Sequence, residues 1–254
     1  MPSGAESVVL PGAAMVPLVR AVDALGAAQL ARYAIVGGVA VTARLGQAHR
    51  ATADVDAVVD ETKPPDAVEA LLAMHGAERD PTGSHRVLVG GTKIEIMGVG
   101  PLDDDDLDGV PPKDALFVAA HVFALETARP MTLIAADDHR TTATAPFATP
   151  AALVAMKLHA IEDRSPSGGL DKRAGDAWDI YRLLVDRDAD GQVRAALANA
   201  PRMLRTLVCE SARRVLVSNA ARTRGWMQAG DPAMAAVTAD ELRFVGQRLV
   251  DAIA

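Results

Sequence analysis

Hydrophobic and polar positions follow two different periods in the first half of the chain. Apolar residues recur at helical spacing over residues 14–32 and predict a helix there. The run "YAIV" leads into Gly37 and Gly38, which predicts a strand that ends in a turn. "VAVTARLG" then predicts a short helix ended by Gly46, and "ADVDAVVD" predicts a second strand. This order of elements is typical of a mixed α/β fold.

The pattern continues with a helix in "KPPDAVEALLAMHG" and a β-hairpin in "HRVLVGGTKIEIMGV", which turns at Gly90 and Gly91. "MTLIAA" predicts another strand, whereas "ALFVAAHVFAL" fits either a helix or a strand. From Thr149 onward the apolar spacing is helical in five successive segments. We therefore expect an α/β (α+β) domain with a mixed sheet over residues 1–148, followed by a helical domain over 149–254.

Composition limits the class of protein. Half of the 254 residues are hydrophobic, which argues against global disorder, and the net charge of −7 argues against a wholly basic nucleic-acid-binding surface. The single cysteine, Cys209, rules out an internal disulfide and fits a reducing compartment. The sequence shows no signal peptide, and no apolar run reaches the roughly 20 residues of a membrane span. We expect a cytoplasmic protein with no membrane partner.

Two aspartates in the second predicted strand are the first candidates for chemistry. Residues two apart on a strand project from one face, so Arg50, Thr52, Asp54 and Asp56 share a face, and the apolar residues between them share the other. Two neighbouring carboxylates repel each other unless a cation lies between them, and Mg²⁺ prefers this kind of ligand. The alternative is that both are ordinary exposed strand residues.

Glu95 is the candidate for a third carboxylate. In "TKIEIMG", Ile94 and Ile96 face one way, and Glu95 faces the other with Lys93. Together with Asp54 and Asp56 it would complete a site for two metal ions, which stabilises both the attacking and the leaving oxygen in phosphoryl transfer. The alternative is a hairpin residue that faces solvent.

Gly37 and Gly38 lie between a strand and a helix, where backbone N–H groups can approach phosphate oxygens without a Cβ in the way. The Rossmann and P-loop glycine spacings are both absent from the sequence. The glycine pair is therefore interpreted together with the acidic strand that follows it.

A second group of candidates lies in the helical half. Lys157 has apolar neighbours at the helical spacings before and after it, so it must either extend its ammonium to solvent or meet an anion. Asp176 and Asp179 lie on one side of the next helix. They could pair with Lys172, Arg173 or Arg182, or they could belong to a functional site.

The motif "VGGVAV…R…T.DVD" resembles the opening motif of the DNA polymerase-β-type nucleotidyltransferases, with Gly37, Gly38, Asp54 and Asp56 at the matching positions. The later segment "LVAMKLHAIEDRSPSGGLDKRAGDAWDIYRLL" is similar to a pattern of the AbiEii/MenT-like toxin branch, in which a helical lysine precedes a basic loop and D-x-x-D. The resemblance covers roughly residues 30–187. Several relatives have Gly-Ser at the phosphate turn, whereas Gly37-Gly38 offers no hydroxyl.

The resemblance implies a polymerase-β-like nucleotidyltransferase domain that uses two Mg²⁺ ions and an NTP. It implies that Asp54, Asp56 and Glu95 bind metal, and that Lys157 with Asp176 or Asp179 completes the nucleotide pocket. Nucleotide-binding roles are implied for the glycine pair and for five further residues: Arg50, Thr52, Arg164, Lys172 and Arg173. The implied acceptor is RNA, the tRNA 3′ end in particular, and the implied protein partner is a cognate antitoxin.

Other acceptors and an inactive protein are alternatives. The acceptor could be a small molecule of the aminoglycoside type or a protein hydroxyl, and a catalytically dead homologue could act by binding alone. The segment 202–224 contains several arginines and a single acidic residue, Glu210: Arg202, Arg205, Arg213, Arg214, Arg222 and Arg224. They could hold an RNA backbone or form the solvated face of two helices.

Overall fold

The computed structural model describes residues 6–47, 52–60, 66–100, 107, 109–136, 141–164, 170–228 and 232–254. The chain forms two compact units. The α/β unit contains Met1–Pro101 and Ala124–Thr149, and the helical unit contains Leu102–Phe123 and Pro150–Ala254. The segment Leu102–Phe123 thus groups with the helical unit, although its place in the chain favours the first predicted domain. The assignment of two domains, with a boundary between residues 148 and 149, stays a prediction.

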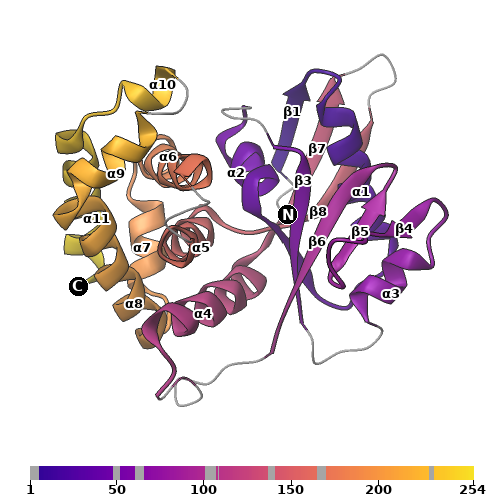
Figure 1. Cartoon of the computed structure of the whole chain (residues 1–254), viewed down its shortest axis with the longest axis horizontal. Coiled ribbons are helices and arrows are strands. Elements are labelled where there is room, and N and C mark those ends of the chain that lie inside the picture. Colours follow the sequence, from indigo (N-terminus) through magenta and orange to yellow (C-terminus); the bar gives the residue numbers. More distant parts are fainter. Residues whose placement is uncertain are drawn as a thin grey trace, which may run out of the picture. The chain divides into compact units, whose positions relative to one another are not determined.

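The α/β unit is built on one mixed sheet, whose described strands are eight in number (Figure 1). In chain order they are β1 (Glu6–Pro11), β2 (Tyr33–Val36), β3 (Asp54–Asp60), β4 (Ala77–Arg79), β5 (Arg86–Val89), β6 (Thr92–Val99), β7 (Arg129–Ala136) and β8 (Thr142–Phe147). In space the order is β1-β7-β8-β2-β3-β6-β5-β4. The pairs β1–β7, β2–β8 and β3–β6 are parallel, and the other pairs are antiparallel. The prediction of an α/β fold with a mixed sheet is confirmed.

Aliphatic residues supply the core of this unit, as the low aromatic content requires. Ile35, Val55, Ile94 and Leu133 come from four different strands, and all are fully buried. Helix α1 (Met15–Ala27) packs against β7 and β8 through an apolar face. The short helix α3 (Ala67–Leu72) is capped at its N-terminus by Asp66, whose carboxylate accepts a hydrogen bond from the Val68 N–H at 2.8 Å.

Helix α2 (Gly37–Leu45) connects β2 to β3 and is bounded by glycines. Gly37 has φ +66° and starts the helix directly after the extended Val36, while Gly46 ends it with φ +75°. In its last turn the buried Arg44 donates hydrogen bonds to the carbonyls of Phe147 at 2.8 Å and Ala148 at 2.9 Å. Arg44 therefore ties α2 to the chain that follows β8.

The predicted hairpin is present as β5 and β6. Both turn residues have positive φ, +55° at Gly90 and +80° at Gly91, as a two-residue turn with the twist of the sheet requires. Counting outward from this turn, Leu88 lies opposite Lys93 and Arg86 opposite Glu95. The turn therefore fixes which side chains meet Glu95.

Helices make up the second unit (Figure 1). In chain order its elements are α4 (Pro112–Thr127), α5 (Pro150–Asp163), α6 (Leu170–Asp186), α7 (Gln192–Ala198), α8 (Arg202–Ala212), the π-helix η2 (Arg213–Ser218), α9 (Ala220–Met227), α10 (Pro232–Ala235) and α11 (Ala239–Ile253). The ambiguous apolar segment is a helix, α4, whose last residues, from Ala124, belong to the α/β unit.

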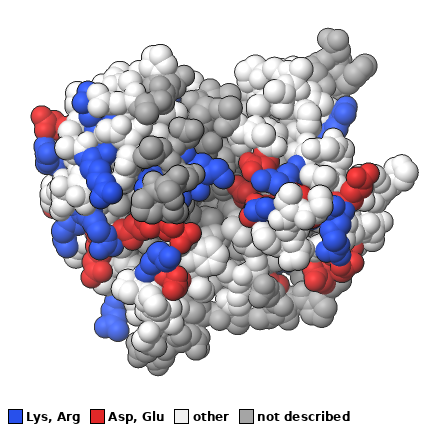
Figure 2. Space-filling model, viewed as in Figure 1, with Lys and Arg blue, Asp and Glu red and all other residues white. Residues whose placement is uncertain are grey.

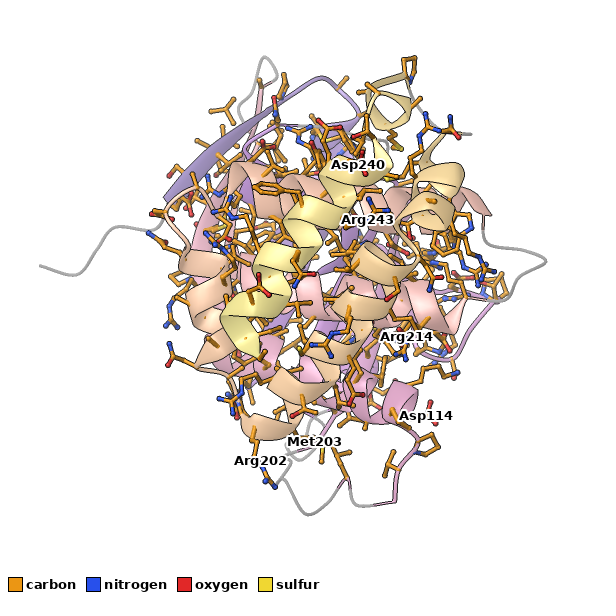
Figure 3. All side chains as sticks on the ribbon, turned by 90° about the vertical axis from the view of Figure 1, so that its left-hand side faces the viewer. Asp114, Arg202, Met203, Arg214, Asp240 and Arg243 are labelled. Carbon is orange, nitrogen blue, oxygen red and sulfur yellow. The ribbon has the colours of Figure 1, made fainter. Side chains whose placement is uncertain are left out.

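Helix α11 organises the helical unit. It starts with a capping box between Thr238 and Glu241 and packs against α7, α8, η2 and α9. Figure 3 shows it crossing the unit, with Asp240 and Arg243 in its first turns. Gly246 lies so close to η2 that an added Cβ would come within 2.5 Å of the Leu216 Cβ. The close contact depends on this glycine.

One helix is interrupted where the sequence pattern predicts continuity over residues 201–221. The structure has α8, then η2, then α9, and the Thr223 hydroxyl donates to the carbonyl of Val215 at 2.7 Å. A π-helical segment inserts extra residues per turn, which apolar spacing alone does not reveal. Within the described parts of the chain, no helix has both the length and the apolar character needed to cross a lipid bilayer.

Candidate functional site

The predicted site residues fall into two groups, one in each unit. In the α/β unit, Asp54 and Asp56 lie on the same face of β3, and β3 pairs in parallel with β6. The register places Asp54 opposite Lys93 and Asp56 opposite Glu95. Both aspartates are partly exposed, as a site open to a ligand requires.

Gly37 and Asp56 are packed directly against each other. β2 pairs antiparallel with β3 so that Val36 lies opposite Asp56, and the chain enters α2 at the next residue. A Cβ added to residue 37 would overlap the Asp56 carboxylate. The glycine therefore leaves space that the carboxylate fills, and it brings the start of α2 next to the aspartate pair.

The start of α2 suits an anion. The first N–H groups of a helix have no partner within the helix, and the helix dipole favours negative charge there. The Asp56 carboxylate is packed against Gly37, the first residue of α2, and Gly38 is buried. Phosphate oxygens are a second kind of anion that such N–H groups bind.

Asp54 has a cation beside it. The Lys93 ammonium lies 2.9 Å from Asp54 Oδ2 and 3.8 Å from Glu95 Oε2. The side chains of Lys93 and Asp54 are 32% and 38% exposed. The hydrogen bond to Asp54 raises the pKa of Lys93 above its usual value, so the ammonium stays charged.

Glu95 is surrounded by basic side chains. Arg86 Nε lies 3.2 Å from Glu95 Oε2, and His85 Nε2 lies 3.3 Å from Oε1. Burial alone would raise the pKa of Glu95, but the hydrogen bond from Arg86 and the charges of Arg86, Lys93 and His85 together lower it. Glu95 thus serves as the anion of a charge cluster, and its part as a third metal ligand stays a prediction.

The sequence reasoning missed Arg86, His85 and Lys93 as partners. Arg86 could have been found, because the glycine turn sets the register that places it opposite Glu95. The contact between Lys93 and Asp54 depends on pairing between β3 and β6, which are separated by α3, β4 and β5. The visible face of the α/β unit in Figure 2 shows acidic and basic side chains intermixed.

The donors at Asp54 and Asp56 fit a magnesium ion. Mg²⁺ is usually held by one or two carboxylates and completed by water and substrate phosphates. The ammonium at 2.9 Å shows that Asp54 already holds a cation. No group of three or more His, Cys, Asp or Glu side chains suited to a metal ion occurs among the described residues. The fit therefore rests on the aspartate pair alone.

Two further candidates lie near β3 in the sequence. Thr52 is half-buried and lies just before the strand. Arg50 lies outside the described residues.

The helical unit contains a buried cluster of four charges. Lys157 on α5 lies 2.7 Å from Asp176 Oδ1 and 2.9 Å from Asp179 Oδ2, both on α6. Arg164 Nε lies 2.7 Å from Asp176 Oδ2. The Lys157, Asp176 and Asp179 side chains are 10%, 3% and 0% exposed. The sequence left two alternatives for the Lys157 ammonium, extension to solvent or contact with an anion. The structure shows contact with the carboxylates of Asp176 and Asp179.

The neighbouring basic residues have other partners. Arg173 is buried and donates to the backbone carbonyls of Ile161 and Arg164, and its guanidinium lies 5.3 Å from the centre of the Trp226 ring. Arg182 pairs with Asp186, and Lys172 is exposed. Pairing of Asp176 and Asp179 with Lys172, Arg173 or Arg182 is therefore not what the structure shows.

The arginines of segment 202–224 are only partly engaged. Arg214 Nε donates to Glu162 at 2.8 Å, and the Arg222 guanidinium lies 5.6 Å from the centre of the Trp226 ring. Figure 3 shows Arg202 at the start of α8 and Arg214 further along the same helical run. Arg202, Arg213 and Arg222 are exposed and have no carboxylate partner within the described part of the chain. This surface keeps uncompensated positive charge.

No protein-family model matches the chain, and no curated protein is similar to it in sequence.

Proposed function

We propose that the protein is a metal-dependent nucleotidyltransferase of the polymerase-β type. In this proposal it transfers a nucleotide from an NTP to a hydroxyl of an RNA acceptor and releases pyrophosphate. The observation that carries the proposal is the packing of Asp56 against Gly37, with Asp54 on the same strand face. It places a carboxylate pair beside the helix start predicted to receive phosphate.

Asp54 and Asp56 would hold magnesium, which stabilises negative charge on the phosphates and on the leaving group when it is bound. The first N–H groups of α2, at Gly37 and Gly38, are the proposed donors to the triphosphate. Backbone donors at this turn require no side chain, which is consistent with the absence of a hydroxyl at residue 38.

In the proposed reaction, the acceptor hydroxyl oxygen forms a bond to the α-phosphorus. The bond from this phosphorus to the oxygen that bridges to the β-phosphate breaks, and pyrophosphate leaves with the electron pair. We assign the hydroxyl proton to a carboxylate of the aspartate pair, since a general base must lie close to the reacting hydroxyl.

The RNA acceptor is supported by the exposed arginines of segment 202–224, because unpaired positive charge favours a phosphate backbone. The tRNA 3′ end as acceptor and an antitoxin as partner rest on the sequence resemblance. Participation of Lys157, Asp176 and Asp179 in this reaction rests on the order of the two motifs, and activity measurements test it.

The test incubates the purified protein with each of the four α-³²P-labelled NTPs, Mg²⁺ and total tRNA. The proposal expects label on tRNA that Asp54→Asn and Asp56→Asn abolish. Asp23→Asn, at an exposed position of α1, is the matched control and keeps full labelling. Absence of label with every NTP, or equal labelling by Asp56→Asn, would contradict the proposal.

A further inference from the structure

Lys93 on β6 faces one of the two aspartates of β3. It lies directly opposite Asp54 across the parallel pair of β3 and β6, and on the same face as Asp54 and Glu95. Neighbouring strands are about 4.8 Å apart, so a lysine side chain is long enough to extend past its partner into solvent. The Lys93 ammonium instead lies 2.9 Å from Asp54 Oδ2.

The surrounding charges explain why Lys93 turns toward Asp54. Glu95 already has Arg86 at 3.2 Å and His85 at 3.3 Å, and Lys93 is farther from it at 3.8 Å. Within the described residues, Lys93 is the basic side chain in an ion pair with Asp54. Charge-assisted hydrogen bonds of this length are among the stronger polar contacts.

We propose that Lys93 is a built-in counter-ion for Asp54, which a divalent cation must displace in order to bind the aspartate pair. The inference rests on the proposed function in taking Asp54 as a metal ligand. Without a cation, Lys93 neutralises Asp54 and reduces its repulsion with Asp56. With a cation bound, the ammonium leaves the carboxylate and remains on the same strand face, where a phosphate of the incoming nucleotide can pair with it.

A cation that must first displace the Lys93 ammonium from Asp54 binds with a lower apparent affinity, because part of its binding free energy is used to break that contact. Both partners are about one-third exposed, so the contact is worth no more than a good surface ion pair. Removing the ammonium should therefore tighten cation binding by about fivefold.

The experiment measures binding of Mn²⁺ to the full-length protein by EPR, because Mn²⁺ prefers the same oxygen ligands as Mg²⁺. Lys93→Met keeps the apolar stem and removes the charge, and we expect it to bind Mn²⁺ about fivefold more tightly than the wild-type protein. Mg²⁺ should displace the Mn²⁺ from both proteins.

Two variants separate direct competition from a general change in charge. Arg86→Met removes a charge that is ion-paired with Glu95 and acts on Asp54 only as a weaker, more distant charge, so it should tighten binding much less. Lys113→Met removes an ammonium that lies 2.8 Å from Asp163 in the helical unit, and it should leave Mn²⁺ affinity unchanged. Thermal unfolding and circular dichroism of each variant check that it is folded.

The outcomes distinguish this inference from the proposed function. If wild-type protein binds Mn²⁺ through Asp54 and Asp56, but Lys93→Met binds it equally or less tightly, the counter-ion role is wrong and the metal site stands. Equal tightening by Arg86→Met also overturns it. If neither the wild-type protein nor Lys93→Met binds Mn²⁺, both proposals fail. Binding by Lys93→Met alone would support the counter-ion role most directly.

Discussion

The Lys157 ammonium lies 2.9 Å from Asp179, whose side chain is fully buried. With Asp176 and Arg164, these residues form two positive and two negative charges in contact. Isolated buried charges are costly, but a balanced and hydrogen-bonded set is tolerated. The cluster thus has a structural role in joining α5 to α6, whatever its part in catalysis.

Lys157→Met should destabilise the protein by about 3 kcal/mol or more, because it leaves buried carboxylates with one cation fewer. The measurement is urea unfolding followed by circular dichroism. Lys113→Met is the matched control, since it breaks a pair of similar length between side chains about half exposed, and it should destabilise the protein much less. Equal costs for both variants would show that the cluster contributes no more than a surface pair.

Gly37→Ala should destabilise the folded protein more than Gly46→Ala does. Both glycines have positive φ, +66° and +75°, so alanine brings about 1–2 kcal/mol of backbone strain at either site. At Gly46 an added Cβ meets no atom within 4 Å, whereas at Gly37 it overlaps the Asp56 carboxylate. We expect Gly37→Ala to cost at least about 2 kcal/mol more in unfolding free energy.

A double-mutant cycle attributes this excess to Asp56. In an Asp56→Ala background the carboxylate is absent and only the Cβ of residue 56, at 2.9 Å, remains close, so the cost of Gly37→Ala should fall part of the way toward that of Gly46→Ala. Additive effects of the two substitutions would contradict the packing described for Gly37 and Asp56.

His121 should make the protein sensitive to acid. Burial lowers the pKa of His121 to about 4, against an ordinary value of about 6.5, despite the hydrogen bond between its Nδ1 and the Phe117 carbonyl at 2.6 Å. The unfolded chain therefore binds the proton more readily than the folded chain. The contribution of neutral His121 to the free energy of unfolding is fully present above pH ~6.5 and is lost as the pH falls toward ~4.

The wild-type protein should lose about 2.5 kcal/mol more than His121→Gln between pH ~7 and ~4.5. His75→Gln, at an exposed position, should follow the wild-type curve. Unfolding in urea at several pH values tests both statements. Parallel curves for the wild-type protein and His121→Gln would show that His121 titrates normally in the folded state.

Arg44→Met should destabilise the protein by about 3 kcal/mol, because the buried carbonyls of Phe147 and Ala148 lose their side-chain donor. Arg44→Lys should recover part of this loss. Arg79→Met, which breaks an exposed pair with Glu69, is the control and should cost under about 1 kcal/mol. A small effect of Arg44→Met would mean that water replaces the guanidinium at these carbonyls.

Elements with strong local signals were predictable from the sequence. The succession of β2, α2 and β3 follows from an apolar run, glycines at both ends of the helix and an alternating strand, and the β5–β6 hairpin follows from Gly90 and Gly91. Helical spacing, which depends only on nearby residues, also predicted that Lys157 either extends to solvent or meets an anion, and the structure shows the second.

Features that depend on distant pairing were not predictable. β1 and β8 were missed, since β1 pairs with β7 far along the chain, while "TATAPF" of β8 carries small residues and a proline. Nor does helical spacing identify Asp176 and Asp179 as the partners of Lys157, because that depends on how α5 packs against α6. Likewise, Lys93 is the partner of Asp54 because β6 pairs with β3, and the sequence of β3 alone does not reveal this.

The grouping of Leu102–Phe123 with Pro150–Ala254 has a consequence for synthesis on the ribosome. Lys113 leaves the exit tunnel 50 residues before Asp163, its partner at 2.8 Å. During that interval β7 and β8 are made, and they can join the sheet while the first turns of α4 still lack the helices they pack with. Once Thr149 has left the tunnel and α5 is still inside it, the apolar side of α4 is therefore exposed, and chaperone binding would concentrate at this stage of translation.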